Sequence, residues 1–252
     1  KDPLKEEKMK LFLVVTLMFG ALLFADLNEE IEKIDAIHNQ NLYENELVEL
    51  EKLNLEFPNE IEILWRLAQV HFDIADQTED KEIHKTYFYP GFEFAKKALE
   101  LNQNSAKANH WYAVLIGKIG ILEGTKQKII NSYQVEIYGL RALELDPIYD
   151  GTLHLMGQWH YKLADLSWAE RKIASLIFAK PPKASFAEAA DYFQKAIVAK
   201  PDEVRHYLWL GKSYLKLKNN EEAIKYLQMS IEMMPIDDAD KLMQKEAKEL
   251  LK

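Results

Sequence analysis

The feature that most constrains the fold is a helical pattern of fixed spacing over residues 204–237. Large and small apolar residues stand at set positions and a proline closes the pattern: Tyr207, Leu210, Gly211, Tyr214, Ala223, Leu227 and Pro235. Small residues let two helices approach closely, and large residues fill the space beside them. Such a pattern predicts an antiparallel helix pair that buries its apolar face by stacking against neighbouring pairs.

These positions match the marks of a tetratricopeptide repeat, and apolar spacings of three to four residues recur upstream. The predicted helix pairs cover residues 27–57, 60–101, 111–147 and 153–201, and a capping helix follows over residues 238–252. We therefore expect an all-α, tetratricopeptide-like array of antiparallel helix pairs in a right-handed superhelix. The array is expected to form a single domain over residues 26–252.

An insertion interrupts the fourth pair. Gly157 and Ala189 lie 189 − 157 = 32 positions apart, whereas the repeat template places such residues about 12 apart. About 20 residues are therefore inserted, near residues 165–185. The turns within the second and third pairs are also predicted to be enlarged, around residues 75–89 and 123–128.

Composition excludes several kinds of site. The 252 residues include 32 basic and 41 acidic side chains, and the net charge of -9 argues against a nucleic-acid partner. The absence of cysteine excludes disulfides, thiolate zinc sites and cysteine nucleophiles. No nucleophile motif or Gly-rich phosphate loop is present, so we expect no catalytic residues, no cofactor and no metal.

The N-terminal region predicts export. An apolar run over residues 11–25 follows Lys5, Lys8 and Lys10, as in a secretory signal. Cleavage is expected after Ala25, although an uncleaved anchor remains an alternative. We therefore expect residues 1–25 to be a signal peptide or membrane anchor, and the protein to be secreted, periplasmic or membrane-anchored. A cytoplasmic or organelle-associated location is the alternative.

Several segments resemble the regulator of microtubule dynamics family. They are LWRLA at 64–68, KANHWYAVLIG at 107–117, HLMGQWHY at 154–161, LSWAERKIASLIFAKPPKASFAEAADYFQKA at 166–196 and LGKSYLKL at 210–217. The resemblance covers roughly residues 45–252, and the insert with its double proline is distinctive. It implies a tetratricopeptide-like domain without catalytic residues. Animal members are associated with microtubules and spindle poles, and some with mitochondrial or endoplasmic reticulum membranes.

The resemblance also implies that set positions on the first helix of each pair line a concave groove. Those positions select Trp65, Gln69, Asn109, Tyr112, His154, Gln158, Tyr161, Lys162, Arg205, Leu208, Lys212 and Lys216. The basic members of this set are suited to receive a carboxylate or phosphate. The alternative is that the lysines form a solvated face and the aromatic residues belong to the core.

The insert supplies a second predicted surface at Trp168, Arg171 and Lys172, because an added segment on a repeat scaffold can carry a binding site. Its alternative role is to cover one end of the groove. The leading hypothesis is a scaffold whose groove binds an extended peptide or helix of a partner protein. The rival hypothesis is recognition of an anionic lipid headgroup, and microtubules are a partner if the protein is cytosolic.

Overall fold

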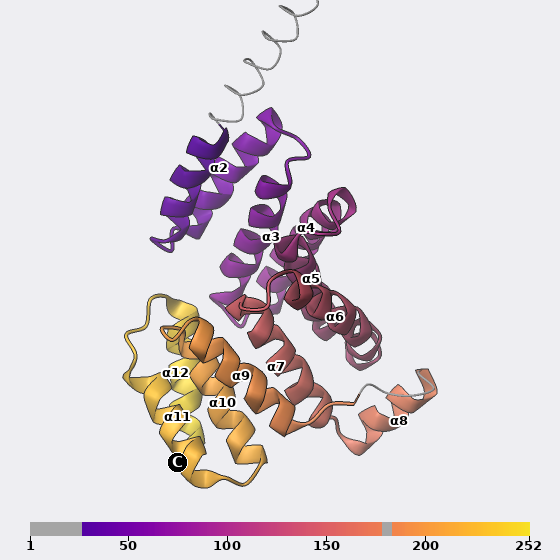
Figure 1. The fold of residues 1–252 in the computed structure, drawn as a ribbon, viewed down its shortest axis with the longest axis vertical. Helices are drawn as coiled ribbons and strands as arrows, with labels where there is room; N and C mark the ends of the chain where they lie inside the picture. The colour runs from indigo at the N-terminus through magenta and orange to yellow at the C-terminus, as the bar shows by residue number, and fades with distance from the viewer. Residues whose placement is uncertain (1–26, 178–182) are drawn as a thin grey trace, which may run out of the picture.

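The computed structural model describes residues 27–177 and 183–252, and all regular elements in these ranges are helices (Figure 1). After a helical segment over residues 27–38 come α2 (Tyr43–Glu56), α3 (Ile61–Asp76), α4 (Lys81–Leu101), α5 (Ala106–Leu122), α6 (Thr125–Leu145), α7 (Asp150–Ala164), α8 (Trp168–Ile177), α9 (Phe186–Ala199), α10 (Val204–Lys216), α11 (Asn220–Glu232) and α12 (Asp238–Leu250). The expected all-α class is confirmed.

The helices pack in the expected pairs. α3 packs with α4, α5 with α6, α7 with α9, and α10 with α11. A hairpin formed by residues 27–38 and α2 precedes them, and α12 closes the array by packing on α10 and α11. In Figure 1 the chain passes from the indigo hairpin at the top to the yellow α12 at the bottom.

The small residues of the repeat pattern stand where two helices touch. A Cβ atom on Gly157 would lie 2.6 Å from Cε1 of Phe193, which is fully buried on α9. A Cβ atom on Gly211 would lie 2.7 Å from Cγ of Leu227 on α11. Only glycine permits these approaches, so the spacing of small and large residues fixes how each pair closes.

The residues expected to enlarge two turns are mostly helical. α3 and α4 are joined by residues 77–80, because Asp80 caps α4 by accepting from the backbone N–H groups of Glu82 and Ile83. α6 begins directly after Gly124, whose φ of +94° allows a sharp turn. The extra residues therefore lengthen α4 and α6 to 21 residues each, and α4 continues through Pro90.

The insert in the fourth pair contributes α8, which projects from the body of the array in Figure 1. Ser167 and Glu170 form a capping box at its start: each side chain accepts from the backbone N–H of the other. Glu170 also forms an ion pair with Lys128 on α6. Of the described residues of α8, Ala174 is the buried one, so α8 adds little to the core.

Candidate functional site

A cavity of about 320 Å³ lies between the helices of the array. Its walls come from α3, α5, α6, α7, α10 and α12, so it sits where the first helices of four pairs converge. Its aromatic lining includes Phe72, Trp111, Trp159 and Trp209. Its charged lining consists of Asp76, Lys118, Lys128, Lys162, Arg205 and Glu246.

Most cations of this wall already have an acidic partner. The ion pairs are Lys118–Asp76 at 2.8 Å, Lys128–Glu170, and Arg205–Asp150 at 3.1 Å. Lys212 on α10, which is outside the lining, pairs with the lining residue Glu246 on α12 at 2.6 Å and lies 4.0 Å from the centroid of Trp209. These pairs balance charge within the wall and leave the cations less available to a ligand.

Lys162 on α7 is different, because it forms no ion pair with any residue of 27–177 or 183–252. Its Nζ atom donates to Oε1 of Gln158 at 3.2 Å and lies 5.6 Å from the centroid of Trp209. Burial, followed by the charges of Lys118 and Lys212, lowers the pKa of Lys162 to about 7. Near neutral pH this amine therefore exists in both charged and neutral forms.

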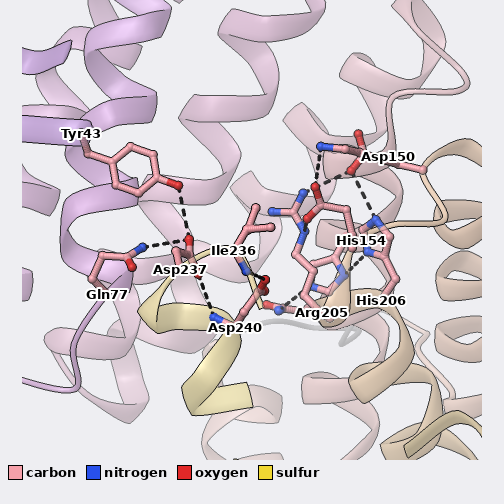
Figure 2. Close-up of polar contacts among 12 residues, drawn as sticks. Tyr43, Gln77, Asp150, His154, Arg205, His206, Ile236, Asp237 and Asp240 are labelled. Carbon is pink, nitrogen blue, oxygen red and sulfur yellow. Dashed lines mark hydrogen bonds and ion pairs between the residues drawn. The ribbon is translucent and has the colours of Figure 1, made fainter. Parts of the chain in front are cut away.

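Gln158 begins a chain of side-chain hydrogen bonds that runs from the cavity into the interface between α7 and α10. Gln158 Nε2 donates to His154 Nε2 at 2.9 Å, and the Nδ1 atoms of His154 and His206 are 3.0 Å apart. His206 Nε2 lies 3.3 Å from Oδ2 of Asp150, which Figure 2 shows between His206 and Arg205. Every atom has a partner if His154 donates from Nδ1 and His206 donates from Nε2.

The surroundings of this chain keep both histidines neutral. Burial lowers the pKa of His206, and burial together with the nearby His206 and Arg205 lowers the pKa of His154 well below its ordinary value. Burial opposes ionisation of Asp150, but the hydrogen bond from His206 and the charge of Arg205 lower its pKa overall. The pair is therefore an uncharged link that ends on an ionised carboxylate.

A second polar cluster joins the two ends of the array, and we call it the clasp (Figure 2). It consists of Tyr43, Gln77, Asp237, Asp238 and Ala239. Oδ2 of Asp237 accepts from the hydroxyl of Tyr43 at 3.3 Å and from Nε2 of Gln77 at 3.2 Å. Oε1 of Gln77 accepts from the backbone N–H groups of Asp238 at 3.1 Å and Ala239 at 3.3 Å. A residue at the end of α3 thus satisfies free donors at the start of α12.

Part of the groove predicted from sequence lines this cavity. The lining includes His154, Gln158, Lys162, Arg205 and Leu208. The predicted basic end is largely neutralised within the protein, because Lys212 and Arg205 have the partners given above and Lys216 pairs with Asp165 at 2.6 Å.

The other predicted groove residues face elsewhere. Trp65 donates to Glu62, Gln69 contacts His38, Asn109 donates to backbone carbonyls of Gln103 and Ser105, Tyr112 donates to Gln134, and Tyr161 packs against Phe186 and Trp209. On α3 the predicted stripe is continued by Phe72 and Asp76, which do line the cavity. Gln69 contacts His38 of the N-terminal hairpin, whereas Trp65 belongs to the core cluster with Ala68 and Trp111.

The insert residues do not line the cavity. Trp168 is 76% exposed with Nζ of Lys172 5.2 Å from its ring centroid, and Arg171 donates to the carbonyl of Ala164 at 3.3 Å. The insert reaches the cavity wall through Glu170 and its ion pair with Lys128. Lys128 lies on α6, the second helix of its pair, whereas the groove prediction used only the first helix of each pair.

Cavity-lining residues of α5 were also missed. Trp111, Val114 and Lys118 line the cavity, whereas the prediction selected Asn109 and Tyr112 on this helix. A shift of one or two positions rotates a helical side chain by about 100–200°. Asn109 and Tyr112 therefore lie on a different side of α5 from the residues that line the cavity. The apolar and basic residues at spacings of three and four are the signal that identifies the correct face. Among the described residues, no group of three or more histidines and carboxylates is placed to hold a metal ion.

Comparison with known proteins identifies relatives over most of the chain. Residues 30–252 match the family model described as Regulator of microtubule dynamics protein 1-3. Regulator of microtubule dynamics protein 1 of Bos taurus is 36% identical over 230 residues, which cover 88% of this chain and 73% of that protein. Regulator of microtubule dynamics protein 3 of Rattus norvegicus is 33% identical over 75% of this chain and 40% of its own length.

Solved structures show the same fold. A thermophilic TPR protein of Thermus thermophilus has a TM-score of 0.63 at 15% identity, and the match covers 90% of this chain and 100% of that chain. The human IFIT1 dimer with m7Gppp-AAAA has a TM-score of 0.51 at 16% identity, with 87% of this chain and 52% of that chain covered. These likenesses confirm the predicted tetratricopeptide-like array.

The comparisons correct the expected location. The relatives are named for the regulation of microtubule dynamics, which contradicts the expectation of a secreted, periplasmic or membrane-anchored protein. Within residues 27–177 and 183–252, no helix has the length and apolar character needed to cross a membrane. The apolar run of residues 11–25, on which the expected signal peptide or anchor depended, lies outside the described residues.

Proposed function

Since the chain belongs to the regulator of microtubule dynamics family, we propose that it is a non-catalytic helical-repeat scaffold that binds a segment of a partner protein in its concave cavity. The observation that carries this proposal is the cavity itself. Four successive helix pairs and the capping helix α12 contribute to its wall, which combines aromatic surface with charged groups. Concave surfaces of repeat arrays are suited to extended or helical segments, which span several repeats at once.

The distribution of charge favours a protein segment over a lipid. The carboxylates of Asp76 and Glu246 and the cations of Lys118 and Lys128 are spread around the wall among the aromatic residues. An acyl chain would place methylene groups against these charges and would remove their water without replacing its hydrogen bonds. A peptide brings backbone and side-chain polar groups that can pair with them.

Binding through the cavity can be tested by filling it. Ser132 lies on the wall, so Ser132→Trp should obstruct the cavity without changing any charge. Val198→Trp is the matched control, because Val198 lies on α9 outside the lining and is 85% exposed. In selection from a display library of random short peptides, we expect the wild type and Val198→Trp to enrich the same sequences and Ser132→Trp to enrich none of them. Equal enrichment by all three proteins would contradict the proposal.

The family name makes tubulin polymer a candidate partner for the same experiment. The match covers 73% of the protein 1 relative and 40% of the protein 3 relative. A microtubule role for this chain is therefore part of the proposal. Co-sedimentation with polymerised tubulin, compared between the wild type and Ser132→Trp, tests it. We expect Ser132→Trp to remain in the supernatant if the cavity holds the tubulin segment. Co-sedimentation that is the same for both proteins would exclude the cavity as the contact.

A further inference from the structure

We propose that Lys162 binds an acidic side chain of the partner segment, and that this carboxylate supplies the ion pair that Lys162 lacks in the cavity wall. The inference rests on the proposed function, because it specifies the chemistry of the segment that the cavity holds. It identifies the partner segment as one that carries a Glu or Asp next to an apolar residue.

The charges around the cavity leave one vacancy for an anion. Lys118, Lys128, Arg205 and Lys212 each have a carboxylate within ion-pair distance, on α3, α8, α7 and α12 respectively. Lys162 has none among the described residues. In a chain with a net charge of -9, an unpaired amine surrounded by other cations marks the place where a single negative charge is most stabilised.

The donors of Lys162 also point to a ligand. A lysine ammonium has three donors, and the described residues accept one of them, through Oε1 of Gln158. The remaining donors are free for a carboxylate, which forms short, charge-assisted hydrogen bonds with ammonium groups. Nζ of Lys162 lies 5.6 Å from the ring centroid of Trp209, and Leu208 lines the same cavity, so an apolar residue beside the acid has a surface to cover.

Binding at this site should take up a proton. The pKa of Lys162 is lowered to about 7 by burial and by neighbouring cations, and a bound carboxylate would favour the charged amine and raise that pKa. Above pH 7 the free protein must therefore gain a proton to bind the acid, so affinity should fall as pH rises. The charged and titratable groups that act on Lys162 or line the cavity with it are Asp76 on α3, His110 and Lys118 on α5, Lys128 on α6, His154 on α7, Arg205 and Lys212 on α10, and Glu246 on α12.

Three of these groups bear on the pH profile, and each keeps one protonation state near neutral pH. The pKa of Asp76 is lowered by Lys118 in spite of burial, so Asp76 stays ionised. The pKa of His154 is lowered well below its ordinary value, and burial lowers the pKa of His110 to about 3, so both histidines stay neutral. Lys162 is then the group whose titration the affinity reports.

The test uses the full chain and two pools of synthetic peptides that differ only at a fixed central position, which is Glu in one pool and Gln in the other. We expect the wild type to retain the Glu pool about tenfold better at about pH 6, and to lose most of that preference at about pH 9. Lys162→Met should retain both pools equally, and Lys162→Arg should keep the preference without the loss at high pH. Lys96→Met is the matched control, because Lys96 is exposed on α4 outside the cavity lining.

The outcomes separate this inference from the proposed function. Equal retention of both pools by the wild type, with loss of both in Ser132→Trp, would overturn the role of Lys162 and leave binding in the cavity intact. Retention of neither pool would contradict both proposals. Displacement of the Glu pool by phosphatidylserine vesicles, dependent on Lys162, would assign the site to an anionic lipid and overturn the inference. Far-ultraviolet circular dichroism and thermal unfolding of each variant establish that it is folded.

Discussion

The Nδ1 atoms of His154 and His206 are 3.0 Å apart, and the hydrogen bond between them joins α7 to α10. Both rings are buried, so the bond requires one histidine to donate and the other to accept. Protonation of either ring in place would set two donors against each other. The contact between two successive repeats is thus built from a pair that must remain uncharged.

This pair makes stability depend on pH. The folded-state pKa of each histidine is below 6.5, so the unfolded chain binds more protons as pH falls through that value. The contribution to stability is present above the unfolded pKa and is lost below it, by up to ~1.4 kcal/mol per pH unit for each group. His154→Leu should lower the free energy of unfolding at about pH 7.5 by ~1–3 kcal/mol, because His206 and Gln158 lose their partner. Urea denaturation between about pH 5 and 7.5 should then show a shallower dependence than in the wild type. An unchanged slope would contradict the neutral-pair assignment.

The close approach of α7 and α9 should not tolerate a methyl group. In Gly157→Ala, the new Cβ would lie 2.6–2.8 Å from the ring of Phe193. Phe193 is fully buried against the rings of His154 and Trp209, so moving it would disturb that packing, and we expect a loss of ~2–3 kcal/mol in thermal or denaturant unfolding. Adding Phe193→Leu to Gly157→Ala should recover part of this loss. Strict additivity of the two substitutions would show that the contact is not the cause.

The side of α7 that lines the cavity could be predicted from the sequence. The spacing of Gly157 within the repeat pattern predicted a close helix contact, and His154, Gln158 and Lys162 were placed on the cavity side of one helix. Periodicity gives the face of a helix well when the whole helix follows one template. It does not show which part of a face another element covers: Gln69, which was predicted to line the groove, contacts His38 of the N-terminal hairpin.

Ion pairs that cross between helices could not be predicted either. The sequence shows Lys212 and Lys216 as a basic stripe, but their partners Glu246 and Asp165 come from α12 and the end of α7. Such partners are distant in sequence, and only the superhelical packing brings them together. Lys162 differs from its neighbours because their acidic partners come from other helices, and the sequence does not show those contacts.

The clasp should contribute modestly to stability and strongly to local protection. Gln77→Ala removes the acceptor for the backbone N–H groups of Asp238 and Ala239. Since Gln77 is partly exposed, water can replace some of these bonds, and we expect a loss of ~1 kcal/mol. Hydrogen exchange at the first turn of α12 should accelerate far more than exchange at α5. Gln103→Ala is the control, because Gln103 is exposed and its side chain is outside the clasp. Unchanged exchange at Asp238 would contradict the capping role of Gln77.

Asp73 should produce the opposite pH dependence to the histidines. Its Oδ2 atom is buried without a hydrogen-bond partner among the described residues, and its side chain is 18% exposed. Burial raises its pKa from 3.8 to about 8, although His38 nearby opposes the shift. Between pH 3.8 and about 8 the folded protein therefore keeps a proton that the unfolded chain has released. The free energy of unfolding falls as pH rises through this range, by up to ~1.4 kcal/mol per pH unit. Asp73→Asn should be more stable than the wild type at about pH 8 by ~1 kcal/mol or more, with little difference at about pH 4. A constant difference across this range, measured by urea denaturation, would assign the effect to packing.

An open repeat array can gain or lose whole repeats during evolution, since each added pair needs only a neighbour to stack on. The bonds between Gln77 and the start of α12 remove that freedom. They form only when the number of helix pairs between α3 and α12 brings these two ends of the superhelix together. One additional pair would carry α12 a full step away from Gln77 and Tyr43. The clasp therefore fits one number of repeats, and duplication of a repeat would break its hydrogen bonds.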